Sequence, residues 1–351
     1  SLVILLLALL GYLTIDDLFL SLGASADTLP FIRDYMQIWY AGIILLNIPI
    51  VGNGAMRATG DTISPSIVML SSTILNMILD PIFIFGYGPI SPLGVKGAAI
   101  ATVISWLLCV FVALNFLHFK HKMIMFRNIH KDFMMECWRK LLWLSIPASS
   151  LNLVIAVSMA IVTAFFAQIG PAAVAAYGVA GRIESLAFVF FMALSASLGP
   201  FVGQNWGAGK LERVQRSQTI ALQFSLIYGF GIALLLFILA EDIASFFTAD
   251  DKVALVLVAF LQIVPISYAL EGATMMSYSA LNAVHKPVPA AVLNCLQFLG
   301  LYVPFVYLGA HFYGVQGAIF GMCLANLLAG SLVYIFRKRI FTTLQSEQIQ
   351  V

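Results

Sequence analysis

The sequence has little charge and few cysteines. Only 10% of its 351 residues are Asp, Glu, Lys or Arg, while 61% are apolar. An ordinary soluble domain is about one quarter charged, so this shortage argues against a soluble fold. The net charge of only +2 gives no reason to expect nucleic acid as a partner. The four cysteines lack metal-ligand spacing, and they are Cys109, Cys137, Cys295 and Cys323.

The beginning of the chain also lacks two common features. It opens with Ser1 rather than Met and is apolar from Leu2 onward, without a basic stretch before the apolar run. A secretory signal peptide would carry positive charge there and a small-residue cleavage site afterwards. We therefore expect the chain to begin inside a transmembrane helix.

Long apolar segments are abundant and recur along the whole chain. A stretch of about twenty apolar residues is long enough to cross the hydrocarbon core of a bilayer as a helix. The sequence therefore predicts an all-α polytopic membrane protein embedded in the lipid bilayer. The ten predicted spans are 1–21, 35–56, 64–86, 94–118, 140–168, 172–201, 217–240, 254–281, 287–309 and 314–336.

Basic residues are distributed unequally between the two sides of this ten-span arrangement. One side receives 14 of the 18 Lys and Arg. By the positive-inside rule that side is cytoplasmic, which also places the C-terminus in the cytoplasm. The 14 residues are Arg57, Lys120, Lys122, Arg127, Lys131, Arg139, Lys140, Lys210, Arg213, Arg216, Lys286, Arg337, Lys338 and Arg339.

The two halves of the sequence resemble each other. Gln37 corresponds to Gln262 and Ala55 to Ala280, both at an offset of 225 residues. The first four spans match the last four, whereas the fifth and sixth have no upstream counterpart. This predicts two six-helix bundles related as parallel repeats by a pseudo-twofold axis, with four plus six helices here and two more expected before Ser1. The predicted divisions are an N-terminal bundle at 1–118, a cytoplasmic linker at 119–139, a C-terminal bundle at 140–340 and a cytoplasmic tail at 341–351.

The first polar pair at membrane depth is Asn76 and Asp80, which are four residues apart and share one helix face. A carboxylate and an amide oxygen can bind Na⁺, or the carboxyl can bind a proton. Pro81 follows and can kink the helix. The alternative is that Asp80 is simply solvated at the outer membrane interface. Thr102 is a candidate cavity hydroxyl, although it could instead satisfy its own helix backbone.

Glu271 lies in the interior of the eighth span. It must face a cavity, stay protonated or pair with another group, for example Arg182. Arg182 and Glu184 are two residues apart, so they do not face each other, and they are left open between a cavity role and structural ion pairs with other helices. Weaker candidates for a substrate cavity, which could equally pack or bridge helices, are Gln37, Asn152, Met159 and Gln297.

Catalytic patterns are missing from the sequence. It contains no phosphate loop, metal-ligand cluster or nucleophile–base combination, so we expect no enzyme activity, no cofactor and no metal other than a coupling Na⁺ at Asp80 and Asn76. We expect a solvated role for His118, His121 and His130, which lie in or beside the basic linker.

Several motifs resemble those of the multidrug and toxic compound extrusion (MATE) family. They are RATGDT at 57–62, NMILDP at 76–81, GVKGAAIAT at 94–102, AAVAAY at 172–177 and VGQNWGAG at 202–209. The resemblance covers essentially the whole chain. It implies two six-helix bundles and a monomer in the bacterial inner membrane. It also implies an antiporter in which Na⁺ or H⁺ drives the export of amphipathic or cationic drugs. An exporter of lipid-linked oligosaccharide or polysaccharide, from the same superfamily, is the alternative.

The resemblance also implies site residues. Asn76 and Asp80, with Thr102 nearby, match the cation site of the family's N-terminal bundle, and Glu271 matches an acidic group used in cation coupling. Two departures weaken this assignment. Ile155 stands where some members carry a glutamate, and the first helix, which in other members supplies an aspartate, is not in the sequence.

Overall fold

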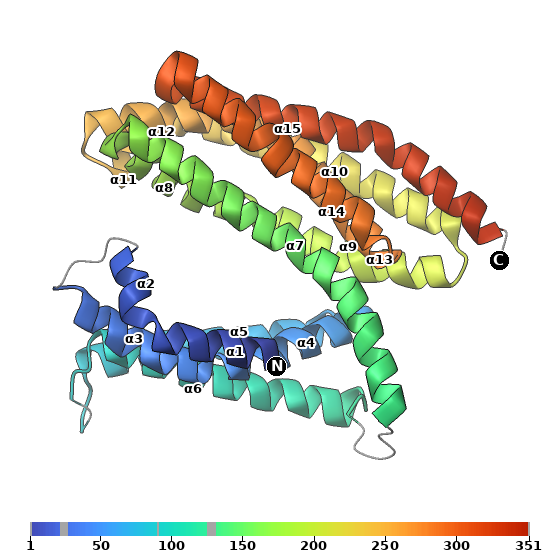
Figure 1. The fold of residues 1–351 in the computed structure, drawn as a ribbon, viewed down its shortest axis with the longest axis horizontal. Helices are drawn as coiled ribbons and strands as arrows, with labels where there is room; N and C mark the ends of the chain where they lie inside the picture. Colours follow the sequence, from blue (N-terminus) through green and yellow to red (C-terminus); the bar gives the residue numbers. More distant parts are fainter. Residues whose placement is uncertain (1, 22–26, 90, 125–130, 350–351) are drawn as a thin grey trace. The chain divides into compact units, whose positions relative to one another are not determined.

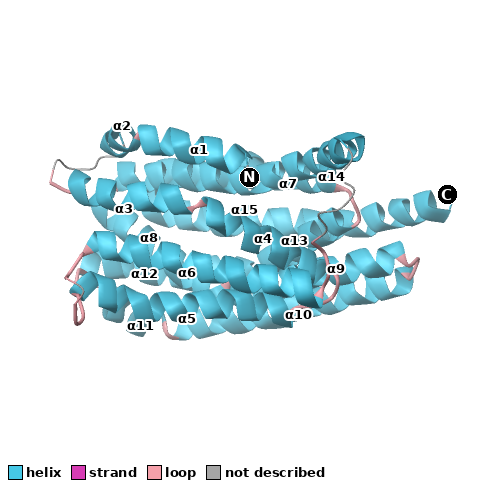
Figure 2. Ribbon diagram, turned by 90° about the horizontal axis from the view of Figure 1, so that it is seen from below, coloured by secondary structure: helices cyan, strands magenta, loops and turns pink. Residues whose placement is uncertain are grey.

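A computed structural model describes residues 2–21, 27–89, 91–124 and 131–349 (Figure 1). Every extended regular element in these ranges is a helix (Figure 2). This confirms the predicted all-α polytopic membrane fold. The chain forms two compact units, residues 1–128 and 129–351, and each is described below by itself.

The N-terminal unit is organised around one helix. This helix, α6, packs against α3, α4 and α5. Gly97 on α6 makes the closest of these approaches possible, because a Cβ there would lie 2.3 Å from the backbone oxygen of Phe83 on α5. The helices of this unit are α1 (Leu2–Leu13), α2 (Ile15–Ser21), α3 (Leu29–Gly42), α4 (Ile44–Ala58), α5 (Ile63–Phe85) and α6 (Val95–Asn115), which a π-helical turn (Phe116–Lys120) extends.

The second predicted span is a broken helix. α3 and α4 meet at an angle of 50°. Gly42 ends α3 and lies against Val103, whose Cγ2 would be 2.4 Å from an added Cβ. Glycine therefore permits close packing of the bend on α6. In contrast, α5 continues through Pro81 to Phe85 as one helix.

The C-terminal unit contains the remaining helices. Each of its predicted spans coincides with one helix or with a helix interrupted by a short break. The helices are α7 (Lys131–Ile169), α8 (Pro171–Ala187), α9 (Val189–Gly207), α10 (Leu211–Ile238), α11 (Ala240–Phe247), α12 (Asp251–Ile263), the 3₁₀ turn η2 (Val264–Ser267), α13 (Tyr268–Ala283), α14 (Pro287–Cys295), the π-helical η3 (Leu296–Tyr302) and α15 (Val303–Ile349).

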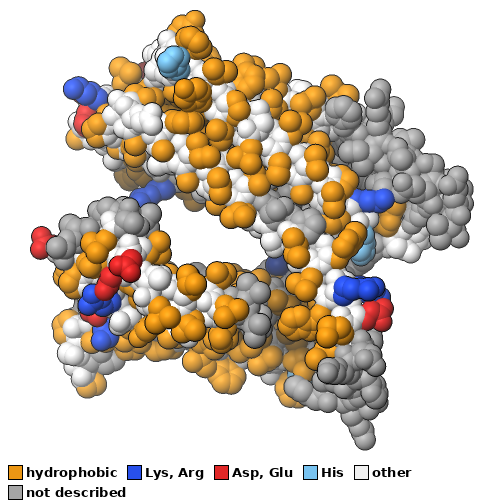
Figure 3. All heavy atoms as spheres, in the orientation of Figure 1, with side chains coloured by type: hydrophobic (Ala, Val, Ile, Leu, Met, Phe, Trp, Pro, Cys, Tyr) orange, Lys and Arg blue, Asp and Glu red, His pale blue; other side chains and the backbone are white. Residues whose placement is uncertain are grey.

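Six of the described helical runs are long and apolar enough to cross a membrane, or up to eight if each of two bent pairs is one span. The longest run, Pro287–Ile335, is interrupted by non-helical backbone at Tyr313 and Gly314. Gly314 has a φ of 60°, a left-handed conformation that glycine adopts easily. The break separates the predicted spans 287–309 and 314–336. The faces of both units that are seen in Figure 3 are rich in hydrophobic side chains, as contact with a bilayer requires.

An aromatic cluster fixes α13 in the C-terminal unit. Phe191 is fully buried and makes edge-on contacts with Tyr228, while Phe188 does so with Tyr268. Gly272 lies so close to Phe191 that an added Cβ would come within 2.3 Å of its ring. Close packing of this kind restricts side-chain freedom, so the cluster gives α13 a defined position against α9 and α10.

Candidate ion-coupling and substrate sites

The structure brings together the three residues that the sequence placed at an N-terminal cation site. The Asn76 amide donates to Oδ1 of Asp80, one turn later on α5, at 3.3 Å. It also lies 3.5 Å from the hydroxyl oxygen of Thr102 on α6. All three side chains are half-buried. The Thr102 hydroxyl donates to the carbonyl of Ala98, so it satisfies its own helix while facing Asn76.

This arrangement is rich in oxygen atoms that can bind a cation. Asp80 contributes a carboxylate, Thr102 a hydroxyl and Asn76 an amide, all groups suited to a hard cation or to a proton. Pro81 adds a further acceptor, because a proline inside a helix has no N–H for the carbonyl four residues earlier, here that of Met77.

A second acidic site lies inside the C-terminal unit. Oε2 of Glu271, in the first turn of α13, accepts a hydrogen bond of 2.9 Å from the Asn326 amide on α15. The charge of Glu184, on α8, interacts with that of Glu271. Tyr268 and Tyr302 lie within electrostatic reach of both carboxylates. We call Glu184, Glu271, Tyr268, Tyr302 and Asn326 the acidic cluster.

Two buried polar atoms of the acidic cluster have no partner among the described residues. They are the hydroxyl of Tyr268, which is fully buried, and the side-chain oxygen of Asn326, which is 3% exposed. Buried polar groups are nearly always hydrogen-bonded, so atoms of this kind mark a place for a water, a proton or an ion. Such a guest would also reduce the repulsion between Glu184 and Glu271 when both are ionised.

Arg182 does not pair with Glu271, which corrects one of the alternatives left open above. The side chain of Arg182 is exposed, and within the described ranges it forms no ion pair. Glu184 is two residues further along α8, about 200° around the helix. The two residues therefore leave α8 in different directions, Glu184 toward the acidic cluster and Arg182 away from it.

The weaker cavity candidates are placed differently from one another. Gln37 lines a pocket of about 430 Å³ in the N-terminal unit. Asn152 is exposed on α7. The Tyr177 hydroxyl lies 3.1 Å from the sulfur of Met159. Gln297 is only 3% exposed, and its side-chain oxygen accepts a hydrogen bond from Tyr278 at 2.9 Å. This favours the helix-bridging role for Gln297.

One polar cluster escaped the sequence reasoning altogether. His121 was expected to be solvated, but its side chain is only 11% exposed and its Nε2 lies 3.0 Å from Oδ2 of Asp61. Lys120 donates to the same oxygen at 2.8 Å. Asp61 also accepts the backbone N–H groups of Ile63 and Ser64, which caps the start of α5.

The charge of Asp61 is therefore well stabilised. Hydrogen bonds from Lys120 and then Ser64 hold the pKa of this carboxyl well below its usual range. The contact joins the loop after α4 to the end of α6, nearly sixty residues later. The available signal was Asp61 within the RATGDT motif, but its partners could not be inferred from spacing.

The C-terminal unit also holds an apolar cavity of about 840 Å³ formed by α12, η2 and α15. Ile263, Phe305, Phe312 and Phe320 are among its lining residues, and Gln316 adds an amide. The lining contains no charged side chain, so the cavity suits an apolar molecule or chain rather than an ion. No group of three His, Cys, Asp or Glu suited to a metal occurs within the described residues.

Comparisons with known proteins identify similar transporters. The MatE family model matches residues 1–82 and 147–308. An FAD transporter of Shewanella oneidensis is 38% identical over 95% of this chain and 74% of its own length. The multidrug export protein MepA of Staphylococcus aureus is 25% identical over 93% of this chain and 72% of its own length. The crystal structure of the Vibrio cholerae MATE transporter VcmN in the bent form is 30% identical, with a TM-score of 0.88 over 98% of this chain and 77% of that one.

Proposed function

Because the chain belongs to the MatE family of membrane transporters, we propose that it is an antiporter in which inward movement of Na⁺ or H⁺ drives the export of organic compounds. The observation that carries this proposal is the contact of Asn76 with both Asp80 and Thr102 across α5 and α6. A carboxyl group that pairs with an amide at membrane depth has a cost that a coupling function explains.

Neutralisation of Asp80 is the first step of the mechanism. When a proton or Na⁺ binds, the negative charge of the carboxylate is neutralised. Its hydrogen bond with the Asn76 amide then becomes weaker, because a neutral acceptor binds a donor less strongly than a charged one. A cation of this kind can shift the balance between conformations only if it binds one of them more tightly. The junction of α5 and α6 is a suitable element for that difference, since the contacts of Asn76 span it.

The acidic cluster supports a second coupling site in the C-terminal unit. In this site α7 carries Ile155 at the position where some relatives have a glutamate. A carboxylate is supplied instead by Glu184 on α8. A cation or proton bound between Glu184 and Glu271 would relieve their repulsion. Release of that cation would restore the repulsion between the two carboxylates. Binding and release would therefore change the forces between the helices that carry Glu184 and Glu271.

Two classes of substrate follow from the relatives. The 38% identity to an FAD transporter favours a flavin nucleotide. The more distant multidrug exporters favour amphipathic or cationic drugs. We place the protein in the bacterial inner membrane as a monomer with a cytoplasmic C-terminus. It needs no cofactor beyond the coupling ion. Export of lipid-linked oligosaccharide is the weaker alternative, because it lacks a comparable relative among those described.

A liposome assay tests the proposal. The full-length protein is reconstituted, an inward Na⁺ or H⁺ gradient is imposed, and efflux of FAD and of ethidium is measured. We expect Asp80→Asn and Glu271→Gln each to lower gradient-driven efflux at least about tenfold, the scale of one lost charged hydrogen bond. The matched control is Glu241→Gln, which removes an exposed carboxylate on α11. Full activity of both variants would refute the proposal.

A further inference from the structure

Arg182 lies on a face of α8 that the proposed ion-coupling sites leave unused. The opposite face of this helix packs into the core through Ala173, Ala176, Ala180, Ile183 and Ala187. The exposed face consists of Pro171, Ala175, Gly178, Arg182 and Ser185, with Leu186 beside Ser185 at its end. These positions recur every three or four residues, so they form one continuous stripe along the helix.

The depth of Arg182 makes its exposure unusual. It is 11 residues after Pro171, the first residue of α8, which corresponds to a rise of about 16 Å. The hydrocarbon core of a bilayer is about 30 Å thick, so Arg182 lies near its middle. A charged side chain there is strongly disfavoured if it faces lipid. Arginine cannot avoid this cost by losing its proton.

The side chains that precede Arg182 along its stripe indicate that this part of the face does not contact lipid. On α10, several exposed positions within the span are large and apolar, such as Ile227, which is 76% exposed, and Leu234, which is 62% exposed. On α8, the exposed positions that precede Arg182 on its stripe, Ala175 and Gly178, are small, whereas Leu186, one turn after Arg182, is 72% exposed. A Cβ added to Gly178 or Gly181 would find no atom within 4 Å. Within the C-terminal unit, no side chain covers α8 at these two glycines, and the arginine makes this part of the helix surface polar.

The positive charge of Arg182 is not balanced within the described part of the chain. The carboxylate nearest in sequence, Glu184, interacts with Glu271 instead. A guanidinium group carries five N–H donors in a planar fork, which fits the two oxygens of a carboxylate or phosphate. An open membrane-depth surface with one unpaired arginine is suited to an organic anion.

We propose that Arg182 binds the phosphate or carboxylate group of the transported compound and selects substrates that carry one. This inference rests on the proposed transport function and makes it more specific. The apolar part of such a compound would lie along the small residues Ala175 and Gly178, which leave room for it. The cationic drugs expected from the family resemblance would gain nothing from Arg182.

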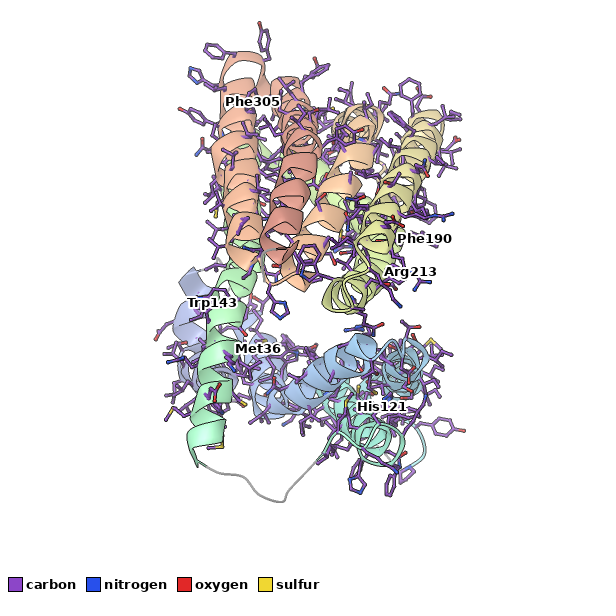
Figure 4. The ribbon with its side chains drawn as sticks, turned by 90° about the vertical axis from the view of Figure 1, so that its right-hand side faces the viewer. Met36, His121, Trp143, Phe190, Arg213 and Phe305 are labelled. Atoms are coloured by element: carbon purple, nitrogen blue, oxygen red, sulfur yellow. The ribbon has the colours of Figure 1, made fainter. Side chains whose placement is uncertain are left out.

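The experiment compares two flavins that differ only by a phosphate. Export of riboflavin 5′-phosphate, riboflavin and ethidium is measured in liposomes of zwitterionic phosphatidylcholine for the wild type, Arg182→Gln and Arg182→Lys. The control is Arg213→Gln, which changes an exposed arginine in the first turn of α10 (Figure 4). We expect R182Q to raise the KM of the phosphate form about 10–100-fold and to leave ethidium and riboflavin unchanged. R182K should be intermediate, because lysine retains the charge but loses the fork.

Other outcomes would overturn the inference. Equal effects of R182Q on both flavins, or no effect, would remove Arg182 from phosphate binding. So would a wild type that exports ethidium but not riboflavin 5′-phosphate, although that result would leave the transport function intact. A repeat with phosphatidylglycerol distinguishes the second source of phosphate. If R182Q acts only when this anionic lipid is present, the arginine binds a lipid headgroup and the substrate assignment is wrong.

Discussion

The hydrogen bond between Tyr278 and Gln297 allows a structural role to be separated from a substrate-binding role. It joins α13 to η3 and is 2.9 Å long, and Gln297 is only 3% exposed. Replacing Tyr278 by Phe removes the donor and leaves the Gln297 oxygen buried without a partner. An unsatisfied buried acceptor costs about 1–3 kcal/mol, whereas hydrogen bonds between membrane helices average about 0.6 kcal/mol. We therefore expect Y278F to destabilise the protein by about 1–2 kcal/mol.

This loss should be measurable as a change in melting temperature. For a unit of this size, 1 kcal/mol corresponds to about 2–4 °C, so Y278F should lower Tm by about 2–8 °C. Adding Gln297→Leu removes the orphaned acceptor and should restore most of the loss, because replacing both partners by apolar groups is close to neutral. Tyr313→Phe, at an exposed tyrosine, is the control and should leave Tm unchanged.

The assay is thermal unfolding of purified protein in detergent, followed by tryptophan fluorescence, together with substrate KM in liposomes. If Gln297 bridges helices, Tm changes and KM does not. If instead Y278F keeps the wild-type Tm and raises KM, the bridging role is wrong and Gln297 belongs to the substrate cavity.

Two further changes test other parts of the structure. Asp61→Asn removes a carboxylate whose pKa is lowered by Lys120. The wild type should therefore be more stable than the variant above about pH 4, the ordinary Asp pKa, and this advantage should shrink as the pH falls below that value. A Tm difference between wild type and variant that grows on acidification would contradict the assignment. Gly97→Ala places a Cβ against the backbone of Phe83, so it should lower Tm by several degrees through about 1–3 kcal/mol of overpacking. The control is Gly54→Ala, which has open space around its Cβ and should leave Tm unchanged. Equal Tm values for the two alanine variants would show that α5 and α6 pack less closely than described.

Much of the fold could be predicted from the sequence. Apolar length alone located most of the spans, because a helix must be long enough to cross the hydrocarbon core. The predicted span 1–21 is the exception, since it consists of the two short helices α1 and α2. The contact between Asn76 and Asp80 could also be predicted, since it depends only on a spacing of four residues within one helix. The break at Gly42 was missed, because it depends on packing against Val103 and the apolar pattern continues through it. The break at Gly314 lies where the sequence divides the spans 287–309 and 314–336.

The arrangement of the polar sites could not be predicted in the same way. In a membrane helix that is apolar on all sides, periodicity does not show which face is buried. The sequence therefore left Arg182 and Glu184 open between cavity and ion-pair roles, whereas the structure directs them to different sides of α8. The contact of His121 with Asp61 spans sixty residues and follows from the packing of α6 against α4 and α5.

The central claim is that Asp80 couples cation entry to export. It is tested most directly by measuring ion movement itself: liposomes containing the full-length protein are loaded with substrate on one side only, and the movement of Na⁺ or H⁺ in the opposite direction is recorded. We predict a substrate-dependent ion flux in the wild type that Asp80→Asn reduces at least about tenfold, with Thr73→Val, an exposed change on the same helix, retaining the full flux. An ion flux in the Asp80→Asn variant equal to that of the wild type would contradict the account.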